Sequence, residues 1–210
     1  MSKQSIGSGL ALVSFLLCVS CNSQQFATIF DRTPKTVEIR SPKIKTIVNN
    51  AVNQTEVTRG YDPAYVKLAY PGGDVPMNTG VCTDVVIRAF RSINLDLQKE
   101  VHQDMQRNFA AYPRNWGLTA PDANIDHRRV PNLMVWLQRK GKALPVTNNS
   151  QDYQPGDIVA WDFGDGQQHI GIVSNMLFAP ARFGIVHNSG RGAMVEDVLF
   201  AWKQIGHYRL

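Results

Sequence analysis

Cys82, His169 and His187 are the residues of this 210-residue sequence whose types and spacing could together perform nucleophilic chemistry. Cys82 follows turn-forming residues and directly precedes an apolar pattern of helical period, which predicts that it begins a helix. Unpaired N–H groups and the helix dipole at such a position favour a thiolate, and the same N–H groups could receive an oxyanion. Asp84 acts in the opposite direction, because a carboxylate in the same turn raises the pKa of a neighbouring thiol.

A nucleophilic thiol needs a general base, and histidine is the side chain best suited to that role near neutral pH. His169 opens the apolar run HIGIV, and His187 closes the run GIVH. If these runs form neighbouring antiparallel strands, the start of one meets the end of the other. One imidazole could then act as the base while the second orients it. Gly171 lies on the same strand face as His169 and leaves room there for the start of the helix.

The same three residues could instead be zinc ligands. The sequence lacks the closely spaced ligand pairs, such as CxxC or HExxH, that make a zinc site recognisable. We therefore expect a thiol nucleophile, with no metal and no cofactor.

The elements that must position these residues are expected in the order helices first, strands second. Helical patterns cover residues 63–70, 82–93, 96–112 and 130–141. Period-two apolar runs predict two strands within 156–175, joined by a turn containing GDG, and further strands within 183–190 and 205–210. Helices followed by an antiparallel meander indicate an α+β fold.

Composition limits the partners of the protein. Hydrophobic residues make up 43% of the chain and charged residues 19%, which is typical of one folded domain with a tail. The net charge of +5 and the pI of about 9.2 come from dispersed basic residues. This mild basicity suits an anionic polymer such as a cell envelope, and without a Lys/Arg cluster we expect no nucleic-acid binding.

Residues 1–21 resemble an export signal. Lys3 is followed by a short apolar run that ends in small residues and is too short to span a bilayer. The ending CVSC resembles a bacterial lipoprotein signal in which Cys21 is acylated, and simple secretion with cleavage nearby is the alternative. Asn22 differs from the Asp that signals retention in the inner membrane. The expected location is therefore the periplasm, with an outer-membrane lipid anchor.

The rest of the chain divides in two. Residues 22–56 are polar and lack a sustained period, so we expect a flexible tether. Residues 57–210 have a globular composition and form the expected domain.

The stretches AYPGGDVPMNTGVCTDVV, PGDIVAWDF followed by HIGIV, and IVHNSG resemble the NlpC-type cysteine peptidases and amidases of the papain-like superfamily. The similarity covers roughly Tyr61 to Leu210 and is closer still to a family of exported bacterial proteins of unknown function within that superfamily. It implies a papain-like NlpC-type fold, with N-terminal helices packed on an antiparallel sheet. It also implies that Cys82 is the nucleophile, His169 the general base and acid, His187 the orienting residue, and Tyr70 an aromatic residue near the oxyanion.

One departure from the pattern bears on the substrate. Relatives that cut peptidoglycan stems carry Asp-Cys-Ser-Gly, in which the Asp and Ser hold a free amine. Here Val81 replaces that Asp, and Asp84, on the other side of the cysteine, is the candidate to compensate. Asn188 is a weaker candidate for the third catalytic residue than His187, because its strand parity is opposite.

The resemblance therefore implies an exported thiol hydrolase that cleaves an amide of bacterial cell-wall peptidoglycan, or of a similar envelope polymer, through an acyl-enzyme. Two alternatives remain open. One is an envelope-binding module that keeps the fold without the activity. The other is a thiol acyltransferase or an amidase on a substrate outside the wall.

Overall fold

A computed structural model describes residues 35–210 of the protein. The expected signal peptide, the lipid-attachment residue Cys21 and the first part of the expected tether lie outside the described residues. The helices are α1 (Pro42–Val57), α2 (Cys82–Arg91), α3 (Leu97–Asn108) and α4 (Val130–Arg139). The strands are β1 (Lys35–Thr36), β2 (Ala143–Leu144), β3 (Ile158–Asp162), β4 (Gln168–Ala179), β5 (Arg182–Asn188), β6 (Ala193–Glu196) and β7 (Lys203–Tyr208).

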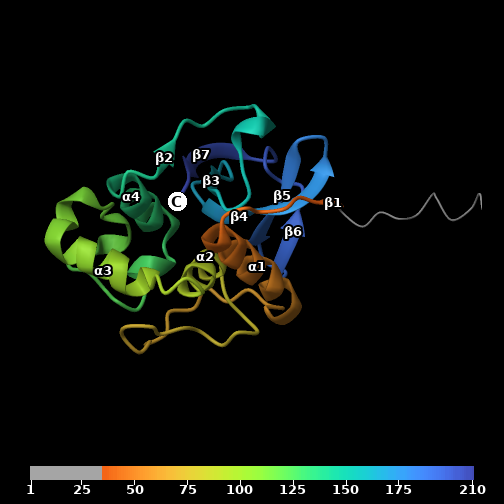
Figure 1. Cartoon of the computed structure of the whole chain (residues 1–210). Helices are drawn as coiled ribbons and strands as arrows, with labels where there is room; N and C mark the ends of the chain where they lie inside the picture. The colour runs from red at the N-terminus through yellow and green to blue at the C-terminus, as the bar shows by residue number, and fades with distance from the viewer. Residues whose placement is uncertain (1–34) are drawn as a thin grey trace, which may run out of the picture. The chain divides into compact units, whose positions relative to one another are not determined.

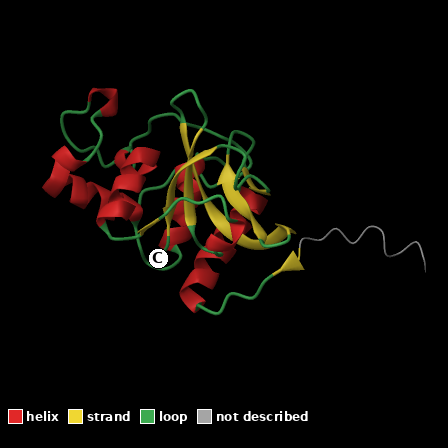
Figure 2. Cartoon of the chain, turned by 90° about the horizontal axis from the view of Figure 1, so that it is seen from above, coloured by secondary structure: helices red, strands yellow, loops and turns green. Residues whose placement is uncertain are grey.

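All the strands pair antiparallel in one sheet, in the order β2-β7-β3-β4-β5-β6, with β1 added to the far end of β4. Helices α1, α2 and α4 contact the sheet, and α3 packs against α2 and α4 (Figures 1 and 2). The protein therefore has the α+β fold, with helices on an antiparallel sheet, that the sequence predicts.

The sheet separates two apolar clusters because strand side chains alternate between its faces. Ile158 and Ala160 of β3 face the helices and join the larger cluster. Val159 and Trp161 face the other way and pack with residues from the loops that cover that side. Both faces of β3 are buried along its first four residues, which are all apolar, and Asp162 ends the strand.

The expectation of a flexible tether is wrong for the end of that segment. Ser41 caps α1 by accepting from the N–H of Ile44 at 3.4 Å, and a proline occupies the first helical position. Ile47, Val48 and Ala51 are fully buried against the rest of the domain. The Ser41-Pro42 pair and the helical spacing of Ile47, Val48 and Ala51 indicated a helix in the sequence. The many polar residues of the segment obscured that pattern.

The helix expected over residues 63–70 does not form. The main-chain N–H of Leu68 donates to Asn124, and the hydroxyl of Tyr65 donates to Asp122. These contacts hold the segment as an irregular strap across the loop that precedes α4. Tertiary hydrogen bonds therefore override the weak local preference for helix.

Candidate active site

Cys82 is the first residue of α2 and is 5% exposed. The loop that leads to it is held by Arg88 of the same helix, whose buried guanidinium donates to Asp74 and to the hydroxyl of Thr58. The same guanidinium donates to the main-chain oxygens of Val75, Pro76 and Thr79. The chain just before the thiol is therefore anchored to the helix that follows it.

Asp84 is buried in an ion pair. Its two oxygens accept from Nε and Nη2 of Arg128 at 3.0 Å each, and Oδ2 also accepts from the N–H of Val81 at 2.7 Å. Arg128 in turn donates to the main-chain oxygens of Asp62 and Ala64. Both carboxylate oxygens of Asp84 are thus engaged by protein groups, and they fix the start of α2. The sequence suggested instead that this carboxylate binds the substrate.

The two histidines meet as their strand positions suggest. Nε2 of His169 lies 2.8 Å from Nδ1 of His187. Strands β4 and β5 pair with Ile172 opposite Val186, so the next step of the ladder sets Gly171 opposite His187 and makes the histidines diagonal neighbours. A Cβ at Gly171 would lie 2.9 Å from the main-chain oxygen of Val186. Gly171 therefore makes room for β5, whereas the sequence suggested that it makes room for the helix.

Glu196 extends this pair and was missed in the sequence. Its Oε2 lies 3.0 Å from the buried Nε2 of His187, within ion-pair distance, and no other group of the described residues is a partner of that nitrogen. Met194 of β6 pairs with His187, so Glu196, two residues further on, is again a diagonal neighbour on the same face. The short strand β6 carries little apolar signal of its own, and only its register against β5 reveals this contact.

The contacts from Glu196 to His187 and from His187 to His169 determine which ring nitrogens carry protons. An ionised carboxylate can only accept, so Glu196 favours a proton on Nε2 of His187. Nδ1 of His187 is then an acceptor, and Nε2 of His169 donates to it. Nδ1 of His169 is left with its lone pair, and within residues 35–210 no hydrogen bond engages it. This is the tautomer that a general base requires.

Burial controls the protonation of the site. It raises the pKa of Cys82 to about 12; the Ile170 backbone opposes this rise and the Asp84 carboxylate adds to it. Burial and the neighbouring His187 lower the pKa of His169 to about 3. The resting site therefore holds a neutral thiol and a neutral imidazole. The helix start favours a thiolate, as expected, but burial outweighs it.

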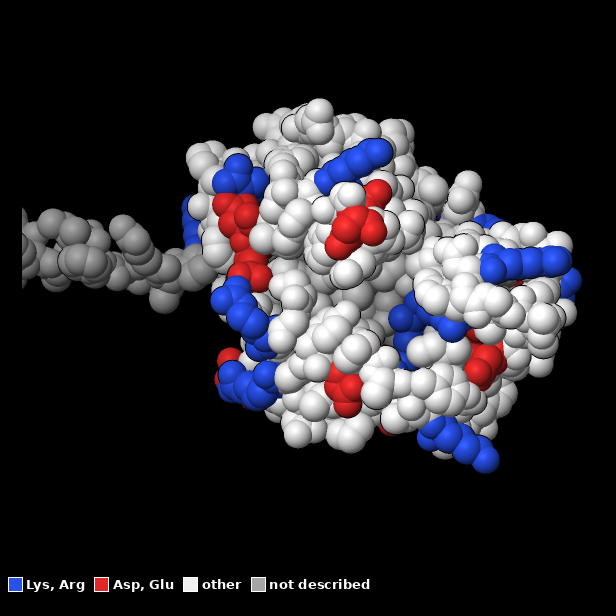
Figure 3. Space-filling view, turned by 180° about the vertical axis from the view of Figure 1, so that it is seen from behind, with Lys and Arg blue, Asp and Glu red and all other residues white. Residues whose placement is uncertain are grey.

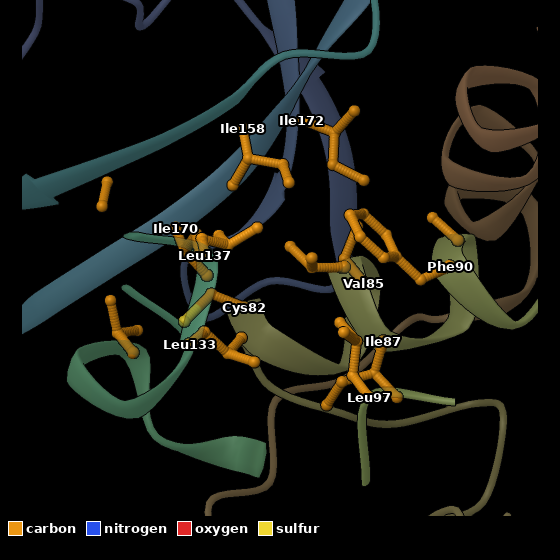
Figure 4. Packing of buried hydrophobic residues seen from close by; sticks show 14 of the residues in the cluster. Cys82, Val85, Ile87, Phe90, Leu97, Leu133, Leu137, Ile158, Ile170 and Ile172 are labelled. Carbon is orange, nitrogen blue, oxygen red and sulfur yellow. The ribbon is translucent and has the colours of Figure 1, made fainter. Parts of the chain in front are cut away.

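Cys82 and His169 approach the sheet from different sides. Cys82 lies at the edge of the larger apolar cluster, beside Ile170, Leu133 and Leu137 (Figure 4). His169 pairs with Trp161 in the ladder and therefore shares the opposite face. Among the residues that the structure describes, no hydrogen bond joins the thiol to the imidazole. The backbone of Ile170, the residue next to His169, favours the thiolate form of Cys82 and so opposes the rise of its pKa.

A cavity of about 360 Å³ opens beside Cys82. Tyr61 lines it, and burial together with the charges of Cys82 and Asp84 raises the pKa of Tyr61 to about 12, so its hydroxyl stays protonated. Tyr70, the expected aromatic residue of the site, instead packs edge-on against His102 with ring centroids 5.2 Å apart. Tyr61 thus takes the place beside the thiol for which the sequence suggested Tyr70.

Asn188 has a different role from His187, as its parity suggests. Its side-chain N–H groups donate to the main-chain oxygens of Gly60 and Gly80 at 3.0 and 2.9 Å. Its oxygen accepts from the N–H groups of Gly190 and Gly192. Asn188 therefore ties the end of β5 to the loop that delivers Cys82.

Other features bear on cofactors and on charge. Within residues 35–210, no group of three or more His, Cys, Asp or Glu side chains is arranged to hold a metal ion. None of the described helices is long and apolar enough to cross a membrane. The face seen in Figure 3 mixes basic and acidic side chains, without one broad patch of a single sign.

Solved structures share this architecture. An N-acetylmuramoyl-L-alanine amidase from Bacteroides uniformis aligns with a TM-score of 0.50 and 14% identity, over 80% of this chain and 99% of the amidase. NlpC1 from Trichomonas vaginalis aligns with a TM-score of 0.42 and 13% identity, over 83% of this chain but only 46% of its own length. The fold of this chain is thus similar to that of the amidase.

Sequence comparison identifies the family. The model of the family called "Domain of unknown function (DUF1287)" matches residues 48–210, and the chain belongs to this family. The uncharacterized protein YijF of Escherichia coli (strain K12) is 50% identical over 200 residues, which are 95% of this chain and 96% of the relative.

Proposed function

We propose that this protein is an exported thiol hydrolase that cleaves an amide bond of bacterial cell-wall peptidoglycan, with Cys82 as nucleophile, His169 as base and His187 as orienting residue. The observation that carries the proposal is the 2.8 Å pairing of the two histidines, one residue along β4 from Ile170, which lies in the same apolar cluster as Cys82. The similarity of the fold to an N-acetylmuramoyl-L-alanine amidase supports an envelope amide as the substrate.

In the proposed reaction, Sγ of Cys82 attacks the amide carbonyl carbon while its proton passes to Nδ1 of His169. The thiol is protonated at rest and the imidazole is neutral, so this transfer accompanies the attack and does not precede it. The N–H groups at the start of α2 stabilise the oxyanion. The C–N bond then breaks, His169 returns the proton to the leaving amine, and water hydrolyses the thioester.

The reaction requires the imidazole of His169 to reach the thiol, which it does not do at rest. The proposed reaction therefore includes a rearrangement at the start of β4, where His169 lies, as substrate enters the cavity. Hydrogen bonds of catalytic groups are often long in the absence of substrate and shorten in the complex.

The test uses purified protein and isolated sacculi. Wild type should release fragments detected by mass spectrometry, whereas Cys82→Ala and His169→Ala should release none. If wild type releases nothing that Cys82→Ala fails to release, the hydrolase proposal is wrong.

An envelope-binding module without turnover is the second candidate. The 5% exposure of Cys82, and the lack of a hydrogen bond between its thiol and His169 within residues 35–210, favour this alternative. It predicts that wild type and Cys82→Ala bind sacculi equally in a pull-down and that neither releases fragments.

The proposed location is the periplasmic side of the outer membrane, with a lipid on Cys21. A labelled palmitate should be incorporated into the wild-type protein in cells. The Cys21→Ser variant should incorporate no labelled palmitate. A Cys21→Ser variant that still carries the label would show that Cys21 is not the site of lipid attachment.

A further inference from the structure

The cavity beside Cys82 is lined by two neighbouring arginines whose surroundings differ. Arg128 is saturated by Asp84 and by main-chain oxygens. Nη1 of Arg129 is buried from solvent and has no hydrogen-bond partner among residues 35–210. A buried guanidinium nitrogen without a partner is costly. Arg129 therefore lines the cavity with a guanidinium that no acceptor among the described residues engages.

Nearby carboxylates do not neutralise Arg129. Asp122 and Asp126 are close enough to favour its charged form, yet neither forms an ion pair with it in the described part of the chain. Oδ2 of Asp126 accepts from the N–H of Asp122 at 2.6 Å. The oxygens of Asp122 accept from Tyr65 and Asn124. Oδ1 of Asp126 is buried without a hydrogen-bond partner in residues 35–210, and neither carboxylate forms an ion pair with Arg129.

Trp116 holds the guanidinium of Arg129 in place. The guanidinium carbon of Arg129 lies 4.2 Å from the centroid of the Trp116 ring, a cation–π contact. Trp116 is 59% exposed and has a left-handed backbone conformation with φ of 65°. A tryptophan in such a conformation is strained, and backbone strain of this kind gathers at sites that bind ligands. The ring and the guanidinium form a preorganised wall on the same cavity as the thiol.

Two further features of this wall favour an anion. Arg129 is the residue before α4, so the positive end of that ten-residue helix adjoins it, and Val130 and Pro131 also line the cavity. A planar guanidinium with free N–H groups matches the two oxygens of a carboxylate.

We propose that Arg129, held against Trp116, binds a carboxylate of the substrate beside the amide that Cys82 attacks, so that the substrate is an acidic peptide. This inference rests on the proposed function. It narrows the candidate amides, because peptidoglycan stem peptides carry free carboxylates that neutral amide substrates lack.

The test measures binding and therefore does not depend on turnover. The probes are a muramyl tripeptide with its carboxylates free and the same compound with its carboxylates converted to primary amides. Calorimetry with the Cys82→Ala protein should show the free acid binding at least about tenfold more tightly than the amide, as expected for a charge-assisted contact. Adding Arg129→Gln should remove this preference.

Arg114→Gln is the matched control, because Arg114 is an exposed arginine of the same loop that also lies over an aromatic ring, 5.7 Å from the centroid of Phe109. It should keep the preference for the free acid. If Arg129→Gln does not fold, Arg129→Lys, which keeps the charge but not the planar fork, should weaken the preference instead.

Each outcome bears on one proposal. Equal affinity for the two probes, or a preference that survives Arg129→Gln, would overturn the carboxylate site. If sacculi release fragments but the two probes bind equally, the hydrolase proposal is supported and only the carboxylate site is contradicted. If the free acid binds more tightly but no fragments are released, the hydrolase proposal is contradicted and the carboxylate site is supported.

Discussion

At the scale of single residues, the candidate site is a line of two buried histidines and a half-buried carboxylate, and the carboxylate sets the protonation of the histidines. Glu196 is the only one of these groups that can do nothing but accept in its ionised form. It orients His187, and His187 orients His169. Glu196, at the far end of this line, therefore determines which nitrogen of His169 carries the proton.

Replacing Glu196 by Gln should keep the size of the side chain but change the protonation of His187. An amide can donate as well as accept, so His187 loses its preference for one tautomer, and the nearby negative charge that raises its pKa is gone. We expect kcat on sacculi to fall roughly tenfold to a hundredfold, with KM little changed. Nitrogen chemical shifts of His169 should show a mixture of tautomers.

Glu56→Gln is the control for that experiment, since Glu56 is an exposed acidic residue on α1, with 80% of its side chain accessible. It should leave both the rate and the spectrum unchanged. An unaltered His169 spectrum in Glu196→Gln would show that the carboxylate does not set the tautomer.

At the scale of elements, the pairing of the histidines depends on how closely β4 and β5 approach. The side chains are diagonal neighbours, and the position between them is glycine. The start of α2 is fixed separately, by the buried pair of Asp84 and Arg128. Thiol and imidazole are thus positioned by two independent sets of contacts, one on each side of the sheet.

Gly171→Ala should push the two strands apart. The added methyl would lie 2.6 Å from Cγ2 of Ile185 and 2.9 Å from the main-chain oxygen of Val186, and a strand backbone cannot move aside cheaply. We expect a loss of about 1–3 kcal/mol in the free energy of unfolding, measured with urea, together with loss of fragment release.

The matched control is Gly60→Ala, where the nearest atom to an added methyl is a methyl of Thr79 at 3.4 Å, an ordinary contact. Gly60→Ala should change the free energy of unfolding by much less than Gly171→Ala does. Equal effects of the two substitutions would mean that close approach of the strands is not what Gly171 provides.

At the scale of the whole molecule, the protein buries titratable groups that stay neutral in the folded state. Burial lowers the pKa of His169 to about 3 and that of His127 to about 4. In the unfolded chain a histidine takes up its proton near pH 6.5. The unfolded state therefore binds more protons than the folded state between about pH 6.5 and these lower values.

Stability should accordingly be fully present above pH 6.5 and fall as the pH drops toward 4. The expected loss between pH 7 and pH 4.5 is roughly 2 kcal/mol for each of these histidines, measured by urea unfolding at the two pH values. His127→Leu should reduce this dependence on pH. A free energy of unfolding that is equal at both pH values would contradict the neutral buried state.

The amino-acid sequence by itself determined the α+β class, helices α2, α3 and α4, and the strands that carry the histidines. Apolar periodicity reports which face of an element is buried, and these elements are long enough to show it. The sequence also singled out Cys82, His169 and His187, because a helix start and two strand ends are local features.

Only the tertiary structure decided which other residues join them. Tyr61 instead of Tyr70 lines the cavity, because loop geometry has no period that a sequence can display. Glu196 contacts His187 because of the strand register. Asp84 forms an ion pair with Arg128, 44 residues away along the chain. The high pKa of the thiol likewise arises from burial, which depends on packing among all the elements and not on its neighbours in sequence.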